Sequence, residues 1–386
     1  MSSNKINLSL MLILGLLMAF TSLSTDIYLP AMPQMEVDLQ GNVELTITGF
    51  LIGFTIAQLV WGAISDRIGR KIPLYIGMCL FIIGSIGCAL STTIGQIVFW
   101  RVFQALGACT APMLSRAIVR DMFRATQAAQ ILSTLTLIMA VAPIVGPLLG
   151  GQLIRFSTWH SIFWLLAIIG AVMFFSLFAL KETHHKEKRA ATPLWAAFRT
   201  YINLLGNKVF MKYTLCVTFF YVAAYAFIAG SPKVYINDFG IEPQYYGYLF
   251  GLNIIGVMTL SFFNRKLVHQ YSLDQLLKVS TLIAMLAGIA LLIVALSGAS
   301  SIVGIVITVF IMFSMNGIIA ACSTAAALDG VPQVAGSASA LIGALQYGSG
   351  IISSLILAWF ADSSFITMAA IIAVSCMLCA LMVWKK

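Results

Sequence analysis

The chain has 386 residues, of which 60% are apolar and only 9% are Asp, Glu, Lys or Arg. An ordinary soluble domain is about a quarter charged, so this composition excludes a soluble globular protein. The net charge of +9 could suggest nucleic-acid binding, but the placement of the charges indicates a membrane orientation instead.

Twelve apolar runs are long enough to cross a membrane, because its hydrocarbon core is about 30 Å thick and a helix rises about 1.5 Å per residue. We therefore expect an all-α integral membrane protein. The twelve transmembrane helices are predicted at residues 8–33, 42–63, 72–92, 95–116, 127–153, 161–180, 209–232, 244–264, 275–297, 300–326, 333–357 and 364–384. The first run is longer than a signal-peptide core and lacks a small-x-small cleavage site, so we interpret it as a span.

A basic segment separates the first six spans from the last six and predicts the domain organisation. We expect an N-terminal six-helix bundle at 1–180, a cytoplasmic linker at 181–208 and a C-terminal six-helix bundle at 209–386, with the two bundles pseudo-symmetric. Apolar residues recur at helical spacing within the linker, at Leu194, Trp195, Phe198, Ile202 and Leu205. They predict a helix on the inner membrane surface, with partner binding as the less favoured alternative.

The basic residues decide the orientation. If both termini are cytoplasmic, all Lys and Arg except Arg101, Arg155 and Lys233 fall on the cytoplasmic side. The positive-inside rule therefore predicts a multi-pass protein of the bacterial inner (cytoplasmic) membrane with both termini in the cytoplasm.

The loop after the second span carries two spaced glycines, one acid and three bases, namely Gly62, Asp66, Arg67, Gly69, Arg70 and Lys71. We expect Gly62 to permit close helix approach and Asp66 to lie at a positive helix N-terminus. The arrangement Gly62-x-x-x-Asp66-Arg67-x-Gly69-Arg70-Lys71 resembles the loop signature of the major facilitator superfamily, and this resemblance implies twelve helices in two six-helix bundles.

Two further segments resemble signatures of that superfamily. The fourth span reads Arg101-Val-Phe-Gln104-Ala-Leu-Gly107, similar to R-x-x-Q-G-x-G. The fifth span resembles the G-x-x-x-G-P-x-x-G-G signature of proton-driven exporters at Gly146, Pro147, Gly150 and Gly151, with Ala142 in place of the leading glycine. Pro143 is a second proline within the same segment. The prolines remove backbone donors and are expected to bend the helix, whereas the glycines allow another helix to pack closely.

The first span narrows the resemblance to one branch. Thr25-Asp26-Ile-Tyr28-Leu-Pro30 is similar to a segment of the bicyclomycin-resistance (Bcr/CflA) branch of drug:proton antiporters. Some members of that branch carry a further acid about two turns earlier, where this chain has Met18, so the resemblance does not extend to a second carboxylate there.

Asp26 is the one acid that falls well inside a predicted span, and Arg101 is the one base. Charged groups at that depth are costly and usually serve function. Both are expected about 10 Å from the outer surface, where they could meet directly or through water. Our hypothesis is that Asp26 carries the coupled proton and Arg101 modulates its protonation; the alternative is a static pair that holds the helices in register.

Polar or aromatic residues on apolar helices are the candidate substrate contacts. They are Tyr28, Gln104, Tyr221, Tyr225, Asn253, Asn316, Gln346 and Tyr347, and packing or interhelical hydrogen bonding explains each of them equally well. A pocket with one acid and several rings would suit neutral or cationic amphiphiles.

The chain shows no clustered nucleophile, base and orienting group, and no metal-ligand spacing, so we predict no enzyme activity and no catalytic residues. We expect no cofactor and no metal, because a proton gradient would drive the cycle. The predicted function is proton-coupled export of small amphipathic compounds or drugs by alternating access, by a protein that contacts substrate, protons and membrane lipid but no nucleic acid and acts as a monomer. The alternatives are a dedicated carrier of a nucleoside, sugar or siderophore, a channel, and a non-transporting membrane receptor.

Overall fold

The computed structural model describes residues 8–123, 125–184, 187, 189, 194–297, 301–360 and 364–384. Within these residues the regular elements are helices, without strands. Twelve helical segments are long and apolar enough to cross a membrane, which confirms the predicted number of spans and the fold class.

The first six spans form what we call the N-terminal half. Its helices are α1 (Leu8–Asp26), η1 (Leu29–Ala31), α2 (Met32–Leu39), α3 (Glu44–Ile68), α4 (Lys71–Ala89), α5 (Ile94–Ala108), α6 (Thr110–Met122), α7 (Ala125–Phe156), α8 (His160–Ser176) and η2 (Leu177–Ala179). The first span continues through α2 to Leu39, beyond the predicted limit at residue 33, because η1 interrupts the helix without ending the span.

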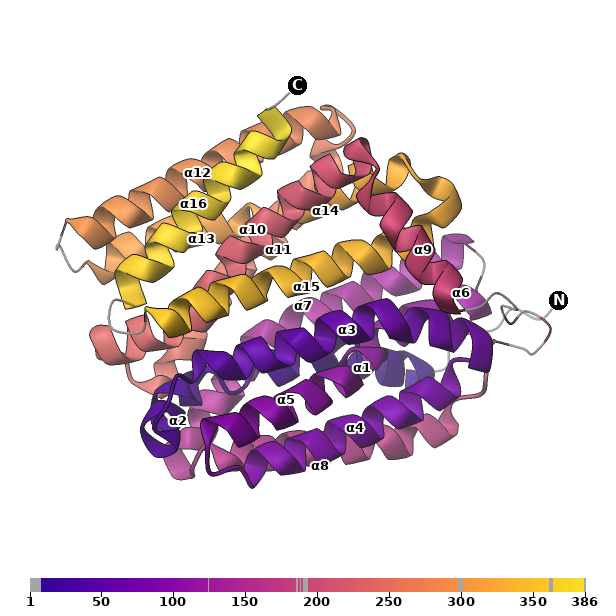
Figure 1. Ribbon diagram of the computed structural model, residues 1–386, viewed down its shortest axis with the longest axis horizontal. Coiled ribbons are helices and arrows are strands. Elements are labelled where there is room, and N and C mark those ends of the chain that lie inside the picture. The colour runs from indigo at the N-terminus through magenta and orange to yellow at the C-terminus, as the bar shows by residue number, and fades with distance from the viewer. Residues whose placement is uncertain are drawn as a thin grey trace.

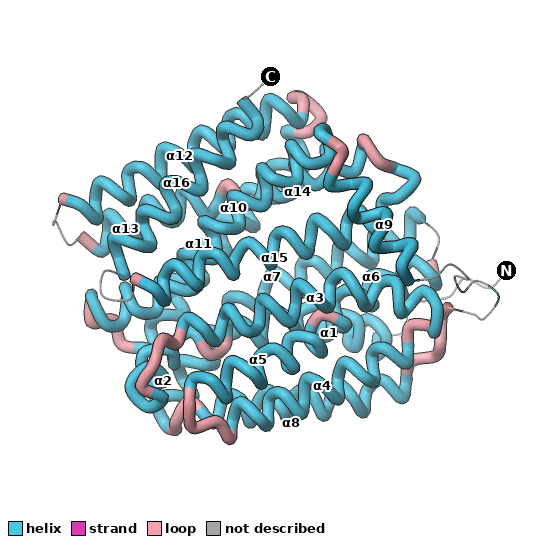
Figure 2. The backbone as a smooth tube through the Cα atoms, in the orientation of Figure 1, coloured by secondary structure: helices cyan, strands magenta, loops and turns pink. Residues whose placement is uncertain are grey.

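The last six spans form the C-terminal half. Its helices are α10 (Lys208–Pro232), the π-helix η4 (Lys233–Asp238), α11 (Pro243–Leu267), α12 (Leu273–Leu296), α13 (Ile302–Ser314), α14 (Asn316–Asp329), η5 (Pro332–Val334), α15 (Ala335–Trp359) and α16 (Ser364–Trp384). Helix α9 (Leu194–Leu205) lies between the halves in sequence, and the connections drawn in pink in Figure 2 are short. The predicted domain limits at residues 180 and 208 stay a prediction.

Prolines account for two helix breaks, the end of α1 and the junction of α5 with α6. Pro30 lacks the N–H that would bond to the carbonyl of Asp26 four residues earlier, and α1 ends at Asp26. Pro112 likewise cannot bond to the carbonyl of Ala108. The hydroxyl of Thr21 donates to that carbonyl over 3.1 Å, which ties α1 to the junction of α5 and α6.

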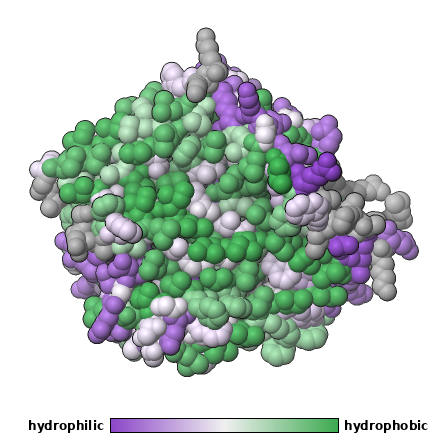
Figure 3. Space-filling view, viewed as in Figure 1, coloured by the Kyte–Doolittle hydropathy of each residue, from purple (hydrophilic) through white to green (hydrophobic). Residues whose placement is uncertain are grey.

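The two halves lie side by side and meet along two helix pairs, α3 with α15 and α7 with α11 (Figure 1). Helix α9 crosses between them at one end of the bundle, where it contacts both α3 and α15. We call this the linker end, and the end that carries α2 and η4 the opposite end. On the face shown in Figure 3, the surface between the two ends is mainly apolar, as expected of a surface that contacts lipid.

Candidate functional site

Asp26 lies at the break between α1 and η1, deep inside the N-terminal half. Its side chain is only 6% exposed, and the hydroxyl of Thr25 donates to Oδ1 over 2.9 Å. A Cβ added to Gly146 of α7 would lie 3.5 Å from the Cβ of Asp26. Asp26 is therefore held where the interrupted first span packs against the fifth.

Arg101 is fully buried and is surrounded by neutral groups. Its Nη1 donates to the carbonyl of Ser24 over 3.2 Å and to Oε1 of Gln104 over 2.6 Å. Its guanidinium carbon lies 4.4 Å from the ring centroids of both Tyr28 and Phe50. These contacts spread the positive charge over carbonyl dipoles and ring faces instead of pairing it with an acid.

Asp26 and Arg101 interact electrostatically without touching. In the described part of the chain no ion pair joins them, although Arg101 acts on the Asp26 carboxyl through space. The sequence leaves open whether Asp26 and Arg101 meet directly or through water, and in this structure they make no direct ion pair. Tyr28 and Gln104 both contact Arg101 and are held by further hydrogen bonds. The Tyr28 hydroxyl lies 3.1 Å from the hydroxyl of Thr46. The Gln104 amide donates to the hydroxyl of Ser85 over 2.7 Å.

Three of the candidate tyrosines meet between the halves. The ring centroid of Tyr225 lies 6.2 Å from that of Tyr221 and 6.3 Å from that of Tyr347. Phe54 of the N-terminal half packs against Tyr347 with ring centroids 4.1 Å apart and ring planes tilted by 37°. Asp26 interacts electrostatically with Tyr225 and Tyr347, the members of this aromatic cluster that come from the C-terminal half.

The remaining candidates differ in what they can offer a ligand. Asn316 is placed beside the Tyr221 hydroxyl, and its Oδ1 is buried without a hydrogen-bond partner within the described residues. Asn253 instead donates to the carbonyl of Leu249 on its own helix. Gln346 is half-buried beside Tyr347 in sequence, and its backbone carbonyl accepts from Ser349. Asn316 therefore retains a free acceptor, whereas the Asn253 amide already makes a hydrogen bond within α11.

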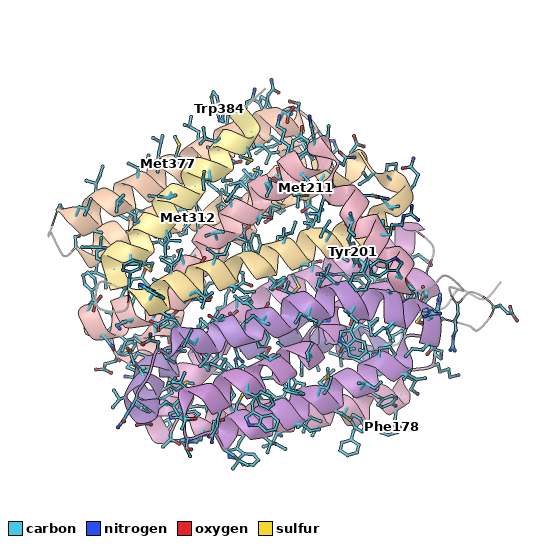
Figure 4. The ribbon with its side chains drawn as sticks, in the orientation of Figure 1. Phe178, Tyr201, Met211, Met312, Met377 and Trp384 are labelled. Carbon is cyan, nitrogen blue, oxygen red and sulfur yellow. The ribbon has the colours of Figure 1, made fainter. Side chains whose placement is uncertain are left out.

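A cavity of about 850 Å³ lies between the halves at the linker end. Its wall comes from α3, the loop after α3, α6, α7, α9, η5 and the start of α15. It includes Gln58, Gly62, Asp66, Arg67, Arg70, Met113, Arg116, Arg120, Leu132, Thr200, Tyr201, Gln333, Gly336, Ser337 and Ser339. Tyr201, labelled in Figure 4, anchors α9 here because its hydroxyl donates to the carbonyl of Leu59 over 3.1 Å.

Polar contacts close the opposite end. The hydroxyls of Thr48 on α3 and Ser354 on α15 lie 2.7 Å apart, and the Asn42 amide donates to the carbonyl of Ala358 over 2.6 Å. Lys233 pairs with Glu36 across the halves at 3.1 Å. A cavity therefore separates the halves at the linker end, whereas polar contacts join them at the opposite end.

The fifth-span motif contributes to this seal. A Cβ on Gly150 would overlap the carbonyl oxygen of Ile27, and one on Gly151 would lie 2.6 Å from the carbonyl oxygen of Pro243. The two glycines therefore bring α7 against the first span and against α11 of the other half. Helix α7 remains one helix through Pro143 and Pro147.

The loop motif differs from two expectations. Gly62 has no atom within 4 Å of an added Cβ, because it faces the cavity and not another helix. Asp66 lies in the last turn of α3 and not at a helix N-terminus. It pairs with Arg70, whose Nε also donates to Asp121 over 2.9 Å.

Glu182 occupies the position expected for Asp66. Its carboxylate accepts from the backbone N–H groups of Arg70 and Lys71, each over 3.0 Å, at the N-terminus of α4. Burial alone would raise the pKa of Glu182, but backbone N–H donors, those of Arg70 and Lys71 among them, lower it below its ordinary value. Gly69, at φ 99°, allows the turn that points these N–H groups at the carboxylate.

Known proteins resemble this chain in sequence and in fold. The family model described as Major Facilitator Superfamily matches residues 14–354. The chain is 36% identical to the "Uncharacterized MFS-type transporter YdgK" of Bacillus subtilis, over 89% of this chain and 87% of that protein. It is 29% identical to the "Bicyclomycin resistance protein homolog" of Haemophilus influenzae, over 97% and 96%. The crystal structure of a D-xylose-proton symporter superposes with a TM-score of 0.76 at 14% identity, over 98% of this chain and 97% of that one.

Proposed function

This chain belongs to the Major Facilitator Superfamily, and from that premise we propose that it is a proton-coupled transporter that exports small amphipathic compounds, drugs among them. The fold and the relatives are those of transporters and not of enzymes. A relative whose name states bicyclomycin resistance supports a drug as substrate.

The observation that carries the proposal is the position of Asp26. The carboxyl is buried where the first span is interrupted and packs against the fifth, and the tyrosines of the other half lie within its electrostatic reach. A group so placed gains or loses water and charged neighbours whenever the halves move relative to each other. Its proton occupancy therefore depends on which end is open, as coupling by alternating access requires.

The aromatic cluster is the proposed substrate contact. Ring faces come from both halves, from Tyr221, Tyr225, Tyr347 and Phe54. Asn316 adds an acceptor, Oδ1, that has no partner among the described residues. Such a surface favours flat amphiphiles with a hydrogen-bond donor or a positive charge.

The proposed orientation follows from charge. The linker end carries Arg67, Arg70, Arg116 and Arg120 around the cavity, so we assign it to the cytoplasm of a bacterial inner membrane, with both termini there. The structure then corresponds to the state that receives substrate from the cytoplasm.

The test uses purified protein in proteoliposomes with a pH-sensitive dye inside and a panel of drugs, nucleosides and sugars added outside. We expect at least one drug to evoke proton flux, and Asp26→Asn to reduce that flux by about tenfold or more while drug binding persists. Asp329→Asn, which changes an exposed aspartate, is the matched control. Wild-type flux in Asp26→Asn would refute the coupling role, and binding without flux for every compound would favour a receptor.

A further inference from the structure

A second set of ionisable groups lies at the opposite end, away from Asp26. Glu44 begins α3, Glu36 lies on α2, and Lys233 begins η4 in the C-terminal half. Lys233 Nζ is 3.1 Å from Glu36 Oε1, so these two residues link the halves directly. We call the three residues the opposite-end cluster.

Glu44 is the buried member of the cluster. It is 2% exposed, and its Oε2 is buried without a hydrogen-bond partner in the part of the chain that the structure describes. Among the described residues Lys233 donates to Glu36, and no hydrogen bond joins its ammonium group to Oε2 of Glu44. A buried carboxylate oxygen without a donor costs free energy that a neutral carboxylic acid avoids in part.

The charges around Glu44 act in both directions. Burial and the negative charge of Glu36 disfavour the charged carboxylate form of Glu44. The carboxylate form is favoured by the backbone N–H of Glu44, by Lys233 and by the N-terminus of α3. Helix α15, which packs along α3, carries no Asp, Glu, Lys, Arg or His. On α5 the charged residue is Arg101, which is engaged by Ser24 and Gln104. With one base and two acids, the cluster is neutral only when one acid is protonated.

We propose that Glu44 is a second proton-binding site, occupied while the opposite end is closed and vacated when that end opens. Opening separates Glu36 from Lys233 and admits water to Glu44, whose O–H bond then breaks as its proton passes to water. Closing reverses this step, so each closure takes up one proton from the outer side. The inference rests on the alternating access of the proposed function, and it adds to Asp26 a second proton-binding group that exchanges its proton at the opposite end.

The test is a distance measurement across the opposite end. Val37 on α2 is 75% exposed and Tyr245 on α11 is 53% exposed, so both accept spin labels as Val37→Cys and Tyr245→Cys. The exposed Cys79 is changed to Ser, and Asp26→Asn is included so that Asp26 contributes no pH dependence. We expect the ratio of closed to open molecules to fall by about tenfold or more from pH 5 to pH 8.

Added Glu44→Gln should remove this pH dependence and leave the end closed, whereas added Glu242→Gln, an exposed acid at the same end, should not. Added Glu44→Asp, which retains a carboxyl, should keep the dependence and controls for misfolding. The proposal is overturned if Glu44→Gln leaves the pH response intact, or if Asp26→Asn alone abolishes it. It is also overturned if replacing Na⁺ with choline at constant pH reproduces the response, because the ligand would then be a metal cation. None of these outcomes alters the flux test of Asp26, so failure of this inference and failure of the proposed function are distinguishable.

Discussion

Arg101 illustrates, at the scale of one residue, how a charge can be buried without an opposite charge. Its planar group donates to Ser24 and Gln104 and lies over two ring faces, which the compact ammonium group of lysine cannot do at the same time. We expect Arg101→Lys to lower the stability by about 2 kcal/mol, seen as a Tm lower by roughly 5 °C in detergent. Arg155→Lys, at an exposed arginine, is the control and should leave the Tm unchanged. Equal losses in both variants would contradict this account of Arg101.

Glu182 gives a prediction with a defined pH range. Its pKa is lowered in the folded protein because, against the effect of burial, backbone N–H groups bind the carboxylate. The stabilisation is therefore complete above the ordinary glutamate pKa of about 4.3 and is lost as the pH falls through the lower folded value. We expect Glu182→Gln to cost about 1 kcal/mol near pH 7 and progressively less below pH 4, measured by thermal unfolding. Glu187→Gln, an exposed acid of the same linker, should show neither effect. A deficit that is the same at every pH would argue against the carboxylate as the cap.

At the scale of elements, α7 depends on a glycine where it crosses the first span. A side chain at Gly150 would overlap the carbonyl oxygen of Ile27, so α7 must move away from the break that holds Asp26. We expect Gly150→Ala to destabilise the protein by about 1–3 kcal/mol and to weaken substrate-evoked proton flux. Gly95→Ala on α5 is the matched control, because open space surrounds that position. Full stability and flux in Gly150→Ala would show that the close contact is dispensable.

Much of this element level could be predicted from sequence. Apolar length predicts the twelve spans, and the isolated charges identify Asp26 and Arg101 as buried. The cap at Glu182 could not be predicted, because a basic linker normally indicates solvated chain. Phe54 was missed because an apolar residue in a span carries no polar signal. Gln58, a polar side chain in the second span, could have been found by the rule that selected Gln104.

At the scale of the whole molecule, the two halves are joined differently at their two ends. Hydrogen bonds and an ion pair join them at the opposite end, whereas a cavity separates them at the linker end. The sequence does not specify which end is open. The same polar residues lie at each end whether that end is open or closed, so their presence does not distinguish the two states. The proposed transport cycle requires the contacts at the opposite end to break and the cavity to close.

The measurement that tests this cycle most directly is a reversible lock on the closed end. Thr48 and Ser354, with hydroxyls 2.7 Å apart, are replaced by cysteines, and the proteoliposomes are assayed for substrate-evoked proton flux after oxidation and again after reduction. We predict that oxidation abolishes the flux and reduction restores it, while the two variants that carry only Thr48→Cys or only Ser354→Cys respond to neither treatment. Undiminished flux through the cross-linked protein would contradict alternating access between these two halves.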